Sequence, residues 1–521
     1  MTLAKVTGGA VVGKSQEGIH LFRGIPFAAP ISGANLWRAP QPVVAWSGTR
    51  EATQPGKACY QPKYSRLMIA ALRMRKASKA FIGTIGPIGT TVGDDCLNLN
   101  VWTPTMDPDA RLPVIVWIHG GGFTSGSGAA AVYDGTALAA KGIVVVTINY
   151  RLGIFGFMGG DDLFPDGVGI ANRGFLDQLA ALRWVHENIR AFGGDRDCVT
   201  VMGESAGATS AIAMMMSPKT DGLIRRVACL SGAAISVFPH EEYSRFARDY
   251  FEQVLGVRPG DAEALMRLSV EQVRAAAPGP PQFLGKHRDR YGALGRDHFT
   301  VFGMATGTEL FPLPLADAIR AGNKRDIDLL IGTCRDESRT WSLSIPGPTA
   351  LTTRAMFRYH SGILNPREDP AATFKNYKAA MPGASALQIY ERAMTDALFR
   401  KWSVAFAGTH SETSPGRTFL YRFDWRSPAV NGALGALHTL DLPGVFQNYR
   451  QWSAMIGSEE AARPAGDALH DAIVSFVKTG TPRSERFPPW SPYDTTHKAC
   501  MVFDTHTELR HDIDAAFEKI W

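Results

Sequence analysis

The pattern of apolar and polar positions predicts strands that alternate with helices along much of the chain. Two nearly continuous apolar runs, residues 113–119 and 142–149, are typical of strands buried on both faces of a parallel sheet. Apolar residues at helical spacing between Leu176 and Ile189 predict a long amphipathic helix. Because strands and helices alternate, the order predicts parallel crossovers and a doubly wound α/β sheet.

The pattern changes at both ends of this α/β region. Residues 95–102 alternate polar and apolar side chains, as in a half-buried strand, and the first hundred residues are predicted to be rich in β-structure. Residues 236–325 and 346–415 are predicted to be helical insertions that form the walls of a substrate gorge. Since neither an internal repeat nor a clear linker interrupts the chain, one domain is predicted over residues 1–521.

The strongest chemical signal is the stretch Gly203-Glu204-Ser205-Ala206-Gly207. A β-branched run precedes it and a helix-forming run follows it, which is the order of a nucleophile elbow. Such an elbow places the serine on a sharp strand-to-helix turn, beside the N–H groups at the start of the helix. Ser205 is therefore the candidate nucleophile.

An upstream glycine run supplies the second part of such a site. Gly120-Gly121-Gly122 follows the buried strand at residues 113–119, where glycine would leave backbone N–H groups accessible to a developing oxyanion. A serine hydroxyl also needs a base and an acid. The residues alone leave both choices open, because Asp336 and Glu337 are adjacent and several histidines follow them. Those histidines are His360, His410, His438, His470, His497, His506 and His511.

Composition narrows the class of partner. The net charge of +6, from 55 basic and 49 acidic residues, is too small for this length to indicate nucleic-acid binding. The basic cluster at residues 66–79 is predicted to be the exposed face of a surface helix, with a flap at a pocket entrance as the alternative. Neither a membrane-spanning apolar run nor a secretory signal is present, so we expect a cytoplasmic protein that does not bind membranes.

Several motifs occur in the order in which they occur in one enzyme family. They are residues 22–28 (FRGIPFA), 95–101 (DCLNLNV), 119–123 (HGGGF), 149–153 (NYRLG), 188–195 (NIRAFGGD) and 203–207 (GESAG). From Gly18 to nearly its end, the chain resembles the type-B carboxylesterases, which include para-nitrobenzyl esterases, mammalian carboxylesterases and cholinesterases. The resemblance implies an α/β-hydrolase fold and a serine carboxylesterase that cleaves small-molecule esters through an acyl-enzyme, without a metal or an organic cofactor.

The resemblance also implies roles for individual residues. It assigns the acid to Glu337 and the base to His438, with Ser205 as the nucleophile. The expected oxyanion donors are Gly121, Gly122 and Ala206. Glu204 and Ser231 are expected to support these groups from behind, Ser231 by contact with the acid.

Some residues depart from the family pattern beside these groups. Cys334 replaces a common asparagine and Ser338 a glycine, while Thr439 and Asp441 replace a glycine and a glutamate, which bears on substrate preference more than on activity. Cys59 and Cys96 match a disulfide of secreted relatives, so a bridge and two free thiols are both open. The residues 236–325 contain no cysteine for the next family disulfide, which favours a bacterial member.

Two other functions compete with ester hydrolysis. A carbamate or amide hydrolase would use the same acyl-enzyme route. Non-catalytic cholinesterase-like binding proteins keep the fold but lose members of the triad, whereas Ser205, Glu337 and His438 all match here.

Overall fold

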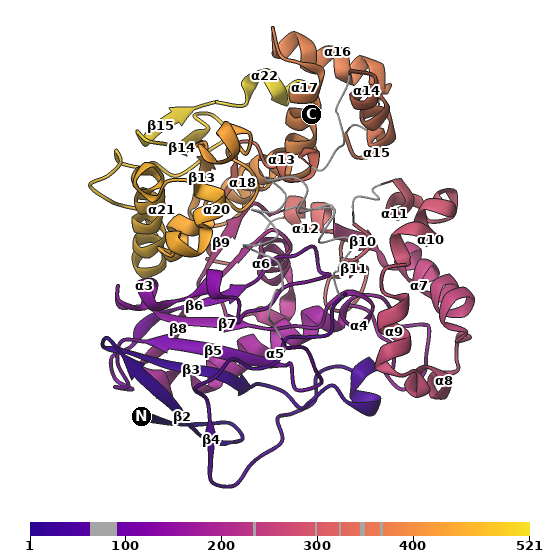
Figure 1. Cartoon of the computed structure of the whole chain (residues 1–521), viewed down its shortest axis with the longest axis vertical. Helices are drawn as coiled ribbons and strands as arrows, with labels where there is room; N and C mark the ends of the chain where they lie inside the picture. Colours follow the sequence, from indigo (N-terminus) through magenta and orange to yellow (C-terminus); the bar gives the residue numbers. More distant parts are fainter. Residues whose placement is uncertain (63–90, 233–235, 297–299, 322–324, 344–349, 365–367) are drawn as a thin grey trace. The chain divides into compact units, whose positions relative to one another are not determined.

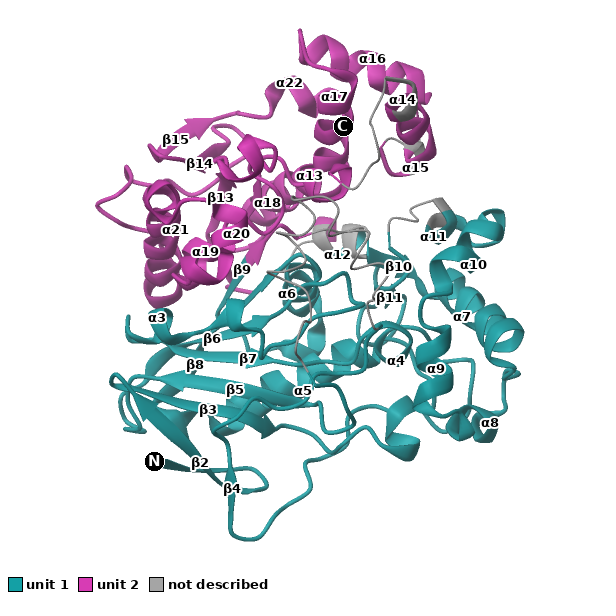
Figure 2. Ribbon diagram, in the orientation of Figure 1, with its two compact units in different colours: residues 1–63, 87–228, 235–318 teal, residues 64–86, 229–234, 319–521 magenta. Residues whose placement is uncertain are grey.

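The structure is a computed structural model, which describes the chain except residues 63–90, 233–235, 297–299, 322–324, 344–349 and 365–367. It divides into two compact units (Figure 2). Unit 1 contains Met1–Lys63, Pro87–Ala228 and Ile235–Ala318, and unit 2 contains Ile319–Trp521 with a short segment that begins at Cys229. The basic cluster at residues 66–79 lies outside the described residues, and the expectation of a single domain stays a prediction.

The strands of unit 1 run in the order β1-β2-β3-β5-β7-β6-β8. Figure 1 labels these strands from β2 onward. Their bounds are β1 Thr2–Val6, β2 Gly9–Gln16, β3 Ile19–Pro26, β5 Asn98–Thr103, β7 Val144–Ile148, β6 Leu112–Ile118 and β8 Gly194–Glu204. The pairs from β1 to β7 are antiparallel, and β6 pairs with β7 and β8 in parallel. A short strand, β4 (Thr49–Glu51), pairs with β2. All five residues of β7 are buried, as its apolar run predicts.

Helices connect and follow these strands. The amphipathic pattern predicted before Gly193 is helix α5 (Arg173–Asn188). Arg151, after β7, forms a fully buried ion pair with Asp177 of α5, with Nη2 2.7 Å from Oδ1. This pair fixes the crossover from β7 to α5.

The remaining helices of unit 1 are α3 Thr136–Ala139, α4 Gly153–Gly156, α6 Ala206–Met216, α7 His240–Leu255, α8 Ala262–Arg267, α9 Val270–Ala276, α10 Pro280–Lys286 and α11 Gly292–Arg296. A separate parallel pair joins β10 (Val237–Pro239) to β11 (Met304–Thr306), and strand β9 (Arg226–Leu230) and helix α12 (Leu315–Ala321) each contain a boundary between the units.

Unit 2 continues the alternation. Strands β12 (Asp328–Cys334), β13 (Thr418–Phe423) and β14 (Ala499–Phe503) are parallel neighbours, and β15 (Glu508–His511) is antiparallel to β14. Every residue of β12 is buried. The helices are α13 Arg339–Ser342, α14 Ala350–Tyr359, α15 Ser361–Leu364, α16 Pro370–Ala380, α17 Ala386–Thr395, α18 Lys401–Thr413, α19 Leu442–Phe446, α20 Ser453–Ile456, α21 Glu459–Thr479 and α22 Ala515–Glu518. One π-helical turn, Asp396–Arg400, joins α17 to α18.

The cysteines all lie in the described residues, and all six are free thiols. The Cys59 Sγ is 3.8 Å from the carbonyl oxygen of Cys96, and burial raises the pKa of the Cys59 thiol well above its usual value. Of the two alternatives that the sequence left open for Cys59 and Cys96, the structure has the two free thiols. In the described part of the chain, no helix combines the length and apolar character that a membrane crossing requires.

Candidate active site

Ser205 lies at a sharp turn between strand β8 and helix α6 in unit 1. Its backbone has φ 57° and ψ −122°, which is rare for a residue with a side chain. A Cβ on Gly207 would lie 2.0 Å from the carbonyl oxygen of Ile118, so this turn needs a glycine where it crosses β6. Because Ser205 immediately precedes α6, its side chain starts beside the N–H groups and the positive end of that helix.

The glycine loop after β6 folds back on itself. The carbonyl oxygen of Gly121 accepts hydrogen bonds from the N–H groups of Thr124 (3.0 Å) and Ser125 (3.2 Å). Gly121 has φ +110°, and a Cβ there would lie 2.1 Å from the Ser125 carbonyl oxygen. A Cβ on Gly120 would meet the Glu204 carboxylate at 2.6 Å. The loop therefore packs directly against the elbow, whose Glu204 side chain, buried at the end of β8, faces Gly120.

Two residues that support this loop were not singled out by the sequence patterns. The His119 ring stacks on Tyr150, with centroids 4.5 Å apart, and the Tyr150 hydroxyl donates to the His119 carbonyl oxygen at 2.8 Å. The His119 Nδ1 lies 2.8 Å from the Gly120 carbonyl oxygen. Burial lowers the pKa of His119 to about 4, so this imidazole is neutral near pH 7. Both residues lie inside the ordered motifs at residues 119–123 and 149–153, and that position was the available signal.

In unit 2, Glu337 is fully buried and its two oxygens have separate partners. Oε1 accepts hydrogen bonds from the Ser231 hydroxyl at 2.6 Å and from the Cys334 N–H at 2.7 Å. Oε2 lies 2.5 Å from Nδ1 of His438. The carboxylate is thus oriented by one side chain and one backbone amide, and its free edge meets the imidazole.

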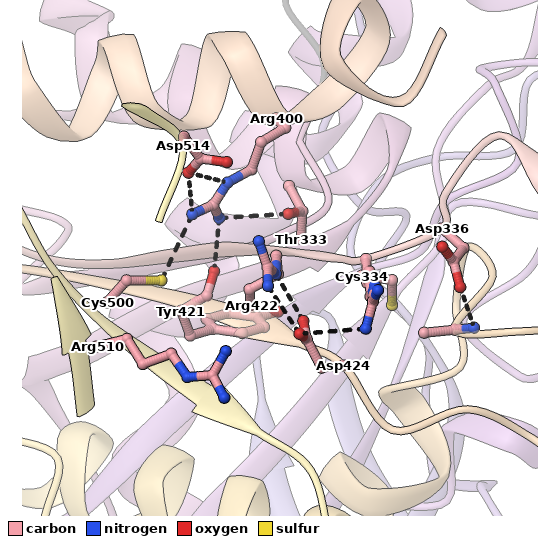
Figure 3. Close-up of polar contacts among 12 residues, drawn as sticks. Thr333, Cys334, Asp336, Arg400, Tyr421, Arg422, Asp424, Cys500, Arg510 and Asp514 are labelled. Atoms are coloured by element: carbon pink, nitrogen blue, oxygen red, sulfur yellow. Dashed lines mark hydrogen bonds and ion pairs between the residues drawn. The ribbon is translucent and has the colours of Figure 1, made fainter. Parts of the chain in front are cut away.

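The neighbouring Asp336 does something different. Its N–H donates to the carbonyl oxygen of Ala436 at 2.9 Å, and its Oδ2 accepts from the Ala436 N–H at 3.0 Å (Figure 3). Asp336 therefore fixes the backbone two residues before His438, whereas Glu337 contacts the His438 ring.

The other candidate histidines lie elsewhere in the structure. Two of them are buried. The Nδ1 of His410 is 2.7 Å from the Thr418 hydroxyl, and the Nδ1 of His470 is 3.0 Å from the Val445 carbonyl oxygen. His360 contacts the Tyr390 hydroxyl, and His497, His506 and His511 are exposed. His438, by contrast, has its Nδ1 2.5 Å from the Glu337 carboxylate.

Two aromatic rings beside His438 were also not foreseen. The Phe399 ring centroid is 4.8 Å from that of His438, and Trp341 is 5.5 Å from it. Phe399 and Trp341 stack on each other at 5.8 Å, with 11° between their planes. They belong to helical segments far from His438 in sequence, and a lone Phe or Trp in a helix gives no signal that separates this role from core packing.

The departures from the family pattern have visible contacts. Ser338 donates from its hydroxyl to the Glu391 carbonyl oxygen at 2.5 Å, which ties the turn after Glu337 to α17. Asp441 accepts a hydrogen bond from the Tyr421 hydroxyl at 2.9 Å. Thr439, immediately after His438, has φ +76°, a conformation that suits glycine and strains a β-branched residue.

No cluster of three or more His, Cys, Asp or Glu side chains suited to a metal ion occurs among the residues that the structure describes. The expectation of catalysis without a metal or cofactor stays a prediction.

Comparisons with known proteins agree over the full length. The model of the carboxylesterase family matches residues 1–521. The para-nitrobenzyl esterase of Bacillus subtilis (strain 168) is 34% identical over 513 residues, covering 97% of this chain and 95% of the relative. The phenmedipham hydrolase of Pseudarthrobacter oxydans is 32% identical over 521 residues, with 98% and 97% covered. Among solved structures, a Geobacillus stearothermophilus carboxylesterase matches with a TM-score of 0.82 at 30% identity, and both chains are covered completely.

Proposed function

This chain belongs to the carboxylesterase family and is a carboxylic ester hydrolase, and from that premise we propose that Ser205, Glu337 and His438 are its catalytic triad. Its fold is the α/β-hydrolase fold of its solved relatives. The observation that carries the proposal is the 2.5 Å contact between the buried Glu337 carboxylate and Nδ1 of His438. A carboxylate in that position fixes the ring tautomer and stabilises the imidazolium that forms during proton transfer.

The proposed reaction has two halves. Ser205 Oγ attacks the ester carbonyl carbon while its proton passes to Nε2 of His438. When the tetrahedral intermediate collapses, the bond to the alcohol breaks and the alcohol leaves with that proton, which produces the acyl-enzyme. A water molecule then attacks the acyl group with His438 as the base, which releases the carboxylic acid and restores the Ser205 hydroxyl.

The oxyanion of each tetrahedral intermediate is assigned to the N–H groups of Gly121, Gly122 and Ala206. The support is that Gly121 and Gly122 belong to a loop folded against the elbow, and that Ala206 opens helix α6. Backbone donors held in this way act at the moment when charge develops on the carbonyl oxygen, without a reorganisation cost.

The substrate class is small-molecule carboxylic esters. The relatives differ in what their names say they act on, since they include a para-nitrobenzyl esterase, a phenmedipham hydrolase and a fumonisin B1 esterase. A chain of this family that acts through an acyl-enzyme would extend to carbamates or amides by the same chemistry. A panel of acyl length and alcohol bulk, continued with matched carbamates and amides, identifies the preferred leaving group.

The test is hydrolysis of p-nitrophenyl acetate and butyrate by wild type and Ser205→Ala. We expect the variant to lose about six orders of magnitude in kcat and to retain background activity alone. Ser217→Ala is the matched control, because it removes a buried hydroxyl that follows the far end of α6 and should leave kcat unchanged. A Ser205→Ala enzyme with the wild-type rate would exclude Ser205 as the nucleophile.

A further inference from the structure

The helix that runs from α17 through the π-turn presents one row of residues to the segment that follows Glu337 and to the ring of His438. Glu391 accepts hydrogen bonds from the Ser342 hydroxyl (2.5 Å) and from Nε of Arg339 (3.1 Å), both on α13 just after Glu337. Four residues on, Thr395 Oγ1 accepts the N–H of Ser338 at 3.2 Å. Four residues further, Phe399 packs on the His438 ring.

A second row, shifted by one residue, faces the C-terminal segment of the chain. Arg392 donates to Oδ1 of Asp514 (3.3 Å) and to Oδ2 of Asp396 (2.9 Å). Arg400, which is buried, donates from Nε and Nη2 to Oδ2 of Asp514, at 2.9 and 2.7 Å. Figure 3 shows this guanidinium enclosed by Asp514 and its neighbours. The helix is thus fixed on two sides by rows of identical spacing.

A regular α-helix would not keep such rows straight. At 3.6 residues per turn, a step of four residues rotates a side chain by about 40° past the previous one, so the third member of each row would turn away by about 80°. The π-turn at Asp396–Arg400 contains the third member of the first row, Phe399, and the second and third members of the second row, Asp396 and Arg400. Because its hydrogen bonds close five residues on rather than four, it winds more slowly and opposes this drift. The π-turn is therefore what keeps Phe399 on the face of Thr395 and Arg400 on the face of Asp396.

Arg400 also reaches the histidine loop by a second route. Its Nη1 donates to the Tyr421 carbonyl oxygen at 2.9 Å, and the Tyr421 hydroxyl donates to Oδ2 of Asp441 at 2.9 Å. Asp441 is three residues after His438. The ion pair with Asp514 therefore supports His438 both through the adjacent Phe399 ring and through the strand β13 that holds the loop.

We propose that the π-turn is a positioning device for the catalytic imidazole, in which the Arg400–Asp514 ion pair holds the turn and Phe399 holds the ring of His438. These residues act through His438 and do not touch the reacting atoms. The inference rests on the proposed function, since it requires His438 to be the base. It predicts that the geometry of the base depends on a carboxylate in the C-terminal segment, more than a hundred residues on from the π-turn.

The test measures kcat and KM for p-nitrophenyl butyrate on folded, gel-filtered Phe399→Leu, Phe399→Tyr, Asp514→Asn and His438→Ala enzymes. Because small displacements of a catalytic group cost up to about a hundredfold, we expect Phe399→Leu and Asp514→Asn to lower kcat by about ten- to a hundredfold, with KM changed less than about twofold. Phe399→Tyr keeps a ring against His438 and should restore kcat. The Phe399→Leu/Asp514→Asn double variant should fall little below either single variant, because both act on one element.

Asp328→Asn is the matched control. Asp328 pairs with Arg417 at 3.1 Å, and its side chain is 4% exposed, as is that of Asp514. It stands at the start of β12, the opposite end from Cys334, so its loss should lower stability and leave kcat unchanged.

The outcomes separate the two proposals. His438→Ala at background with Phe399→Leu and Asp514→Asn at the wild-type kcat would overturn the positioning role and leave the triad intact. Equal losses of kcat in Asp328→Asn and Asp514→Asn would also overturn it, because they would show a general effect of stability. His438→Ala at the wild-type rate would overturn both proposals. If Asp514→Asn does not fold, the contrast between Phe399→Leu and Phe399→Tyr decides: rescue by tyrosine supports the proposal, and equal rates overturn it.

Discussion

Ser205 in unit 1 and His438 in unit 2 are held by different kinds of contact. Around Ser205 the backbone does most of the positioning, through a residue at φ 57°, a glycine that touches the Ile118 carbonyl oxygen and a loop that folds onto the Gly121 carbonyl. Around His438 side chains do it, through the Glu337 carboxylate and the stacked rings of Phe399 and Trp341.

This difference has a physical origin in the groups concerned. A nucleophile elbow must expose one oxygen beside backbone amides, and only close backbone approach can create that arrangement. An imidazole instead needs its tautomer and its ring plane fixed, and a carboxylate and flat rings supply both. We therefore expect catalysis to be lost in unit 1 when a Cβ is added to a glycine around Ser205. In unit 2 we expect it to be lost when a side chain around His438 is changed.

The largest contrast lies between two adjacent carboxylates of unit 2. Glu337→Gln should lower kcat about ten-thousandfold, because the amide can no longer fix the His438 tautomer or stabilise its cation. Asp336→Asn should cost far less, since the Asp336 carboxylate accepts from the backbone of Ala436 and lies 3.8 Å from Arg426, and neither contact involves the His438 ring. Steady-state kinetics on p-nitrophenyl acetate measures both, and a larger loss for Asp336→Asn would show that the acid is assigned wrongly.

The matching change in unit 1 adds one methyl group. Gly121→Ala should lower kcat by about a hundred- to a thousandfold, because the new Cβ lies 2.1 Å from the Ser125 carbonyl oxygen and displaces an oxyanion donor. Gly222→Ala is the control, as Gly222 also has positive φ but has open space around it. Similar kinetics for the two variants would mean that the loop does not act through its shape.

Acid sensitivity offers a comparison that spans both units. Burial lowers the pKa of His119 in unit 1 and of His410 in unit 2 to about 4. The unfolded chain binds protons on these rings near pH 6.5, so their contribution to stability is complete above that pH and is lost as the pH falls towards 4. Each should remove about 3 kcal/mol from the free energy of unfolding over this range.

Urea unfolding of His119→Gln and His410→Gln between pH 7.5 and 4.5 tests this expectation. Both variants should show a weaker dependence of stability on pH than wild type. Only His119→Gln should also lower kcat, because His119 contacts the glycine loop. An unchanged pH dependence in both variants would contradict the proposed cause.

The smallest effect concerns strain beside His438. Thr439→Gly relieves a β-branched residue at φ +76° and should stabilise the protein by about 1 kcal/mol, the strain relieved less the added entropy of the unfolded chain. It should lower kcat several-fold by loosening the backbone next to the base. Val430→Gly, at φ 54° in the kinked 3-10 segment Ala429–Gly432, should give the stabilisation without the loss of kcat. Thermal unfolding and kinetics on both variants would reject the idea if Thr439→Gly destabilised the protein.

The same difference decides how much of the molecule could be predicted from its sequence. Residues 113–119 and 142–149 are confirmed as the buried strands β6 and β7, because continuous apolar runs have few other solutions. The elbow and the glycine loop could be recognised in the sequence because backbone geometry of this kind requires glycine at fixed positions. The choice of Glu337 over Asp336 came from the family resemblance, since adjacent carboxylates look alike in sequence.

The surroundings of His438 could not be predicted. Phe399 and Trp341 come from segments distant in sequence, and both are residue types that are common in ordinary cores. The π-turn also gives no signal in the sequence, because a single wider turn leaves the apolar pattern of a long helix almost unchanged. Ser231 was recognised as a candidate, and its hydroxyl contacts Glu337.

The straight rows of α17 and the π-turn should affect how the chain tolerates substitution. Along a regular helix, sensitive positions drift around the axis and alternate between steps of three and four. Here the sensitive positions should recur every four residues, at Glu391, Thr395 and Phe399, with a parallel series one residue later. A complete substitution scan would reveal both series. Deleting one residue within the π-turn would then shift both series at once. The rotation of the side chains about the axis of this helix then matters to the acid and base as much as any single residue on it.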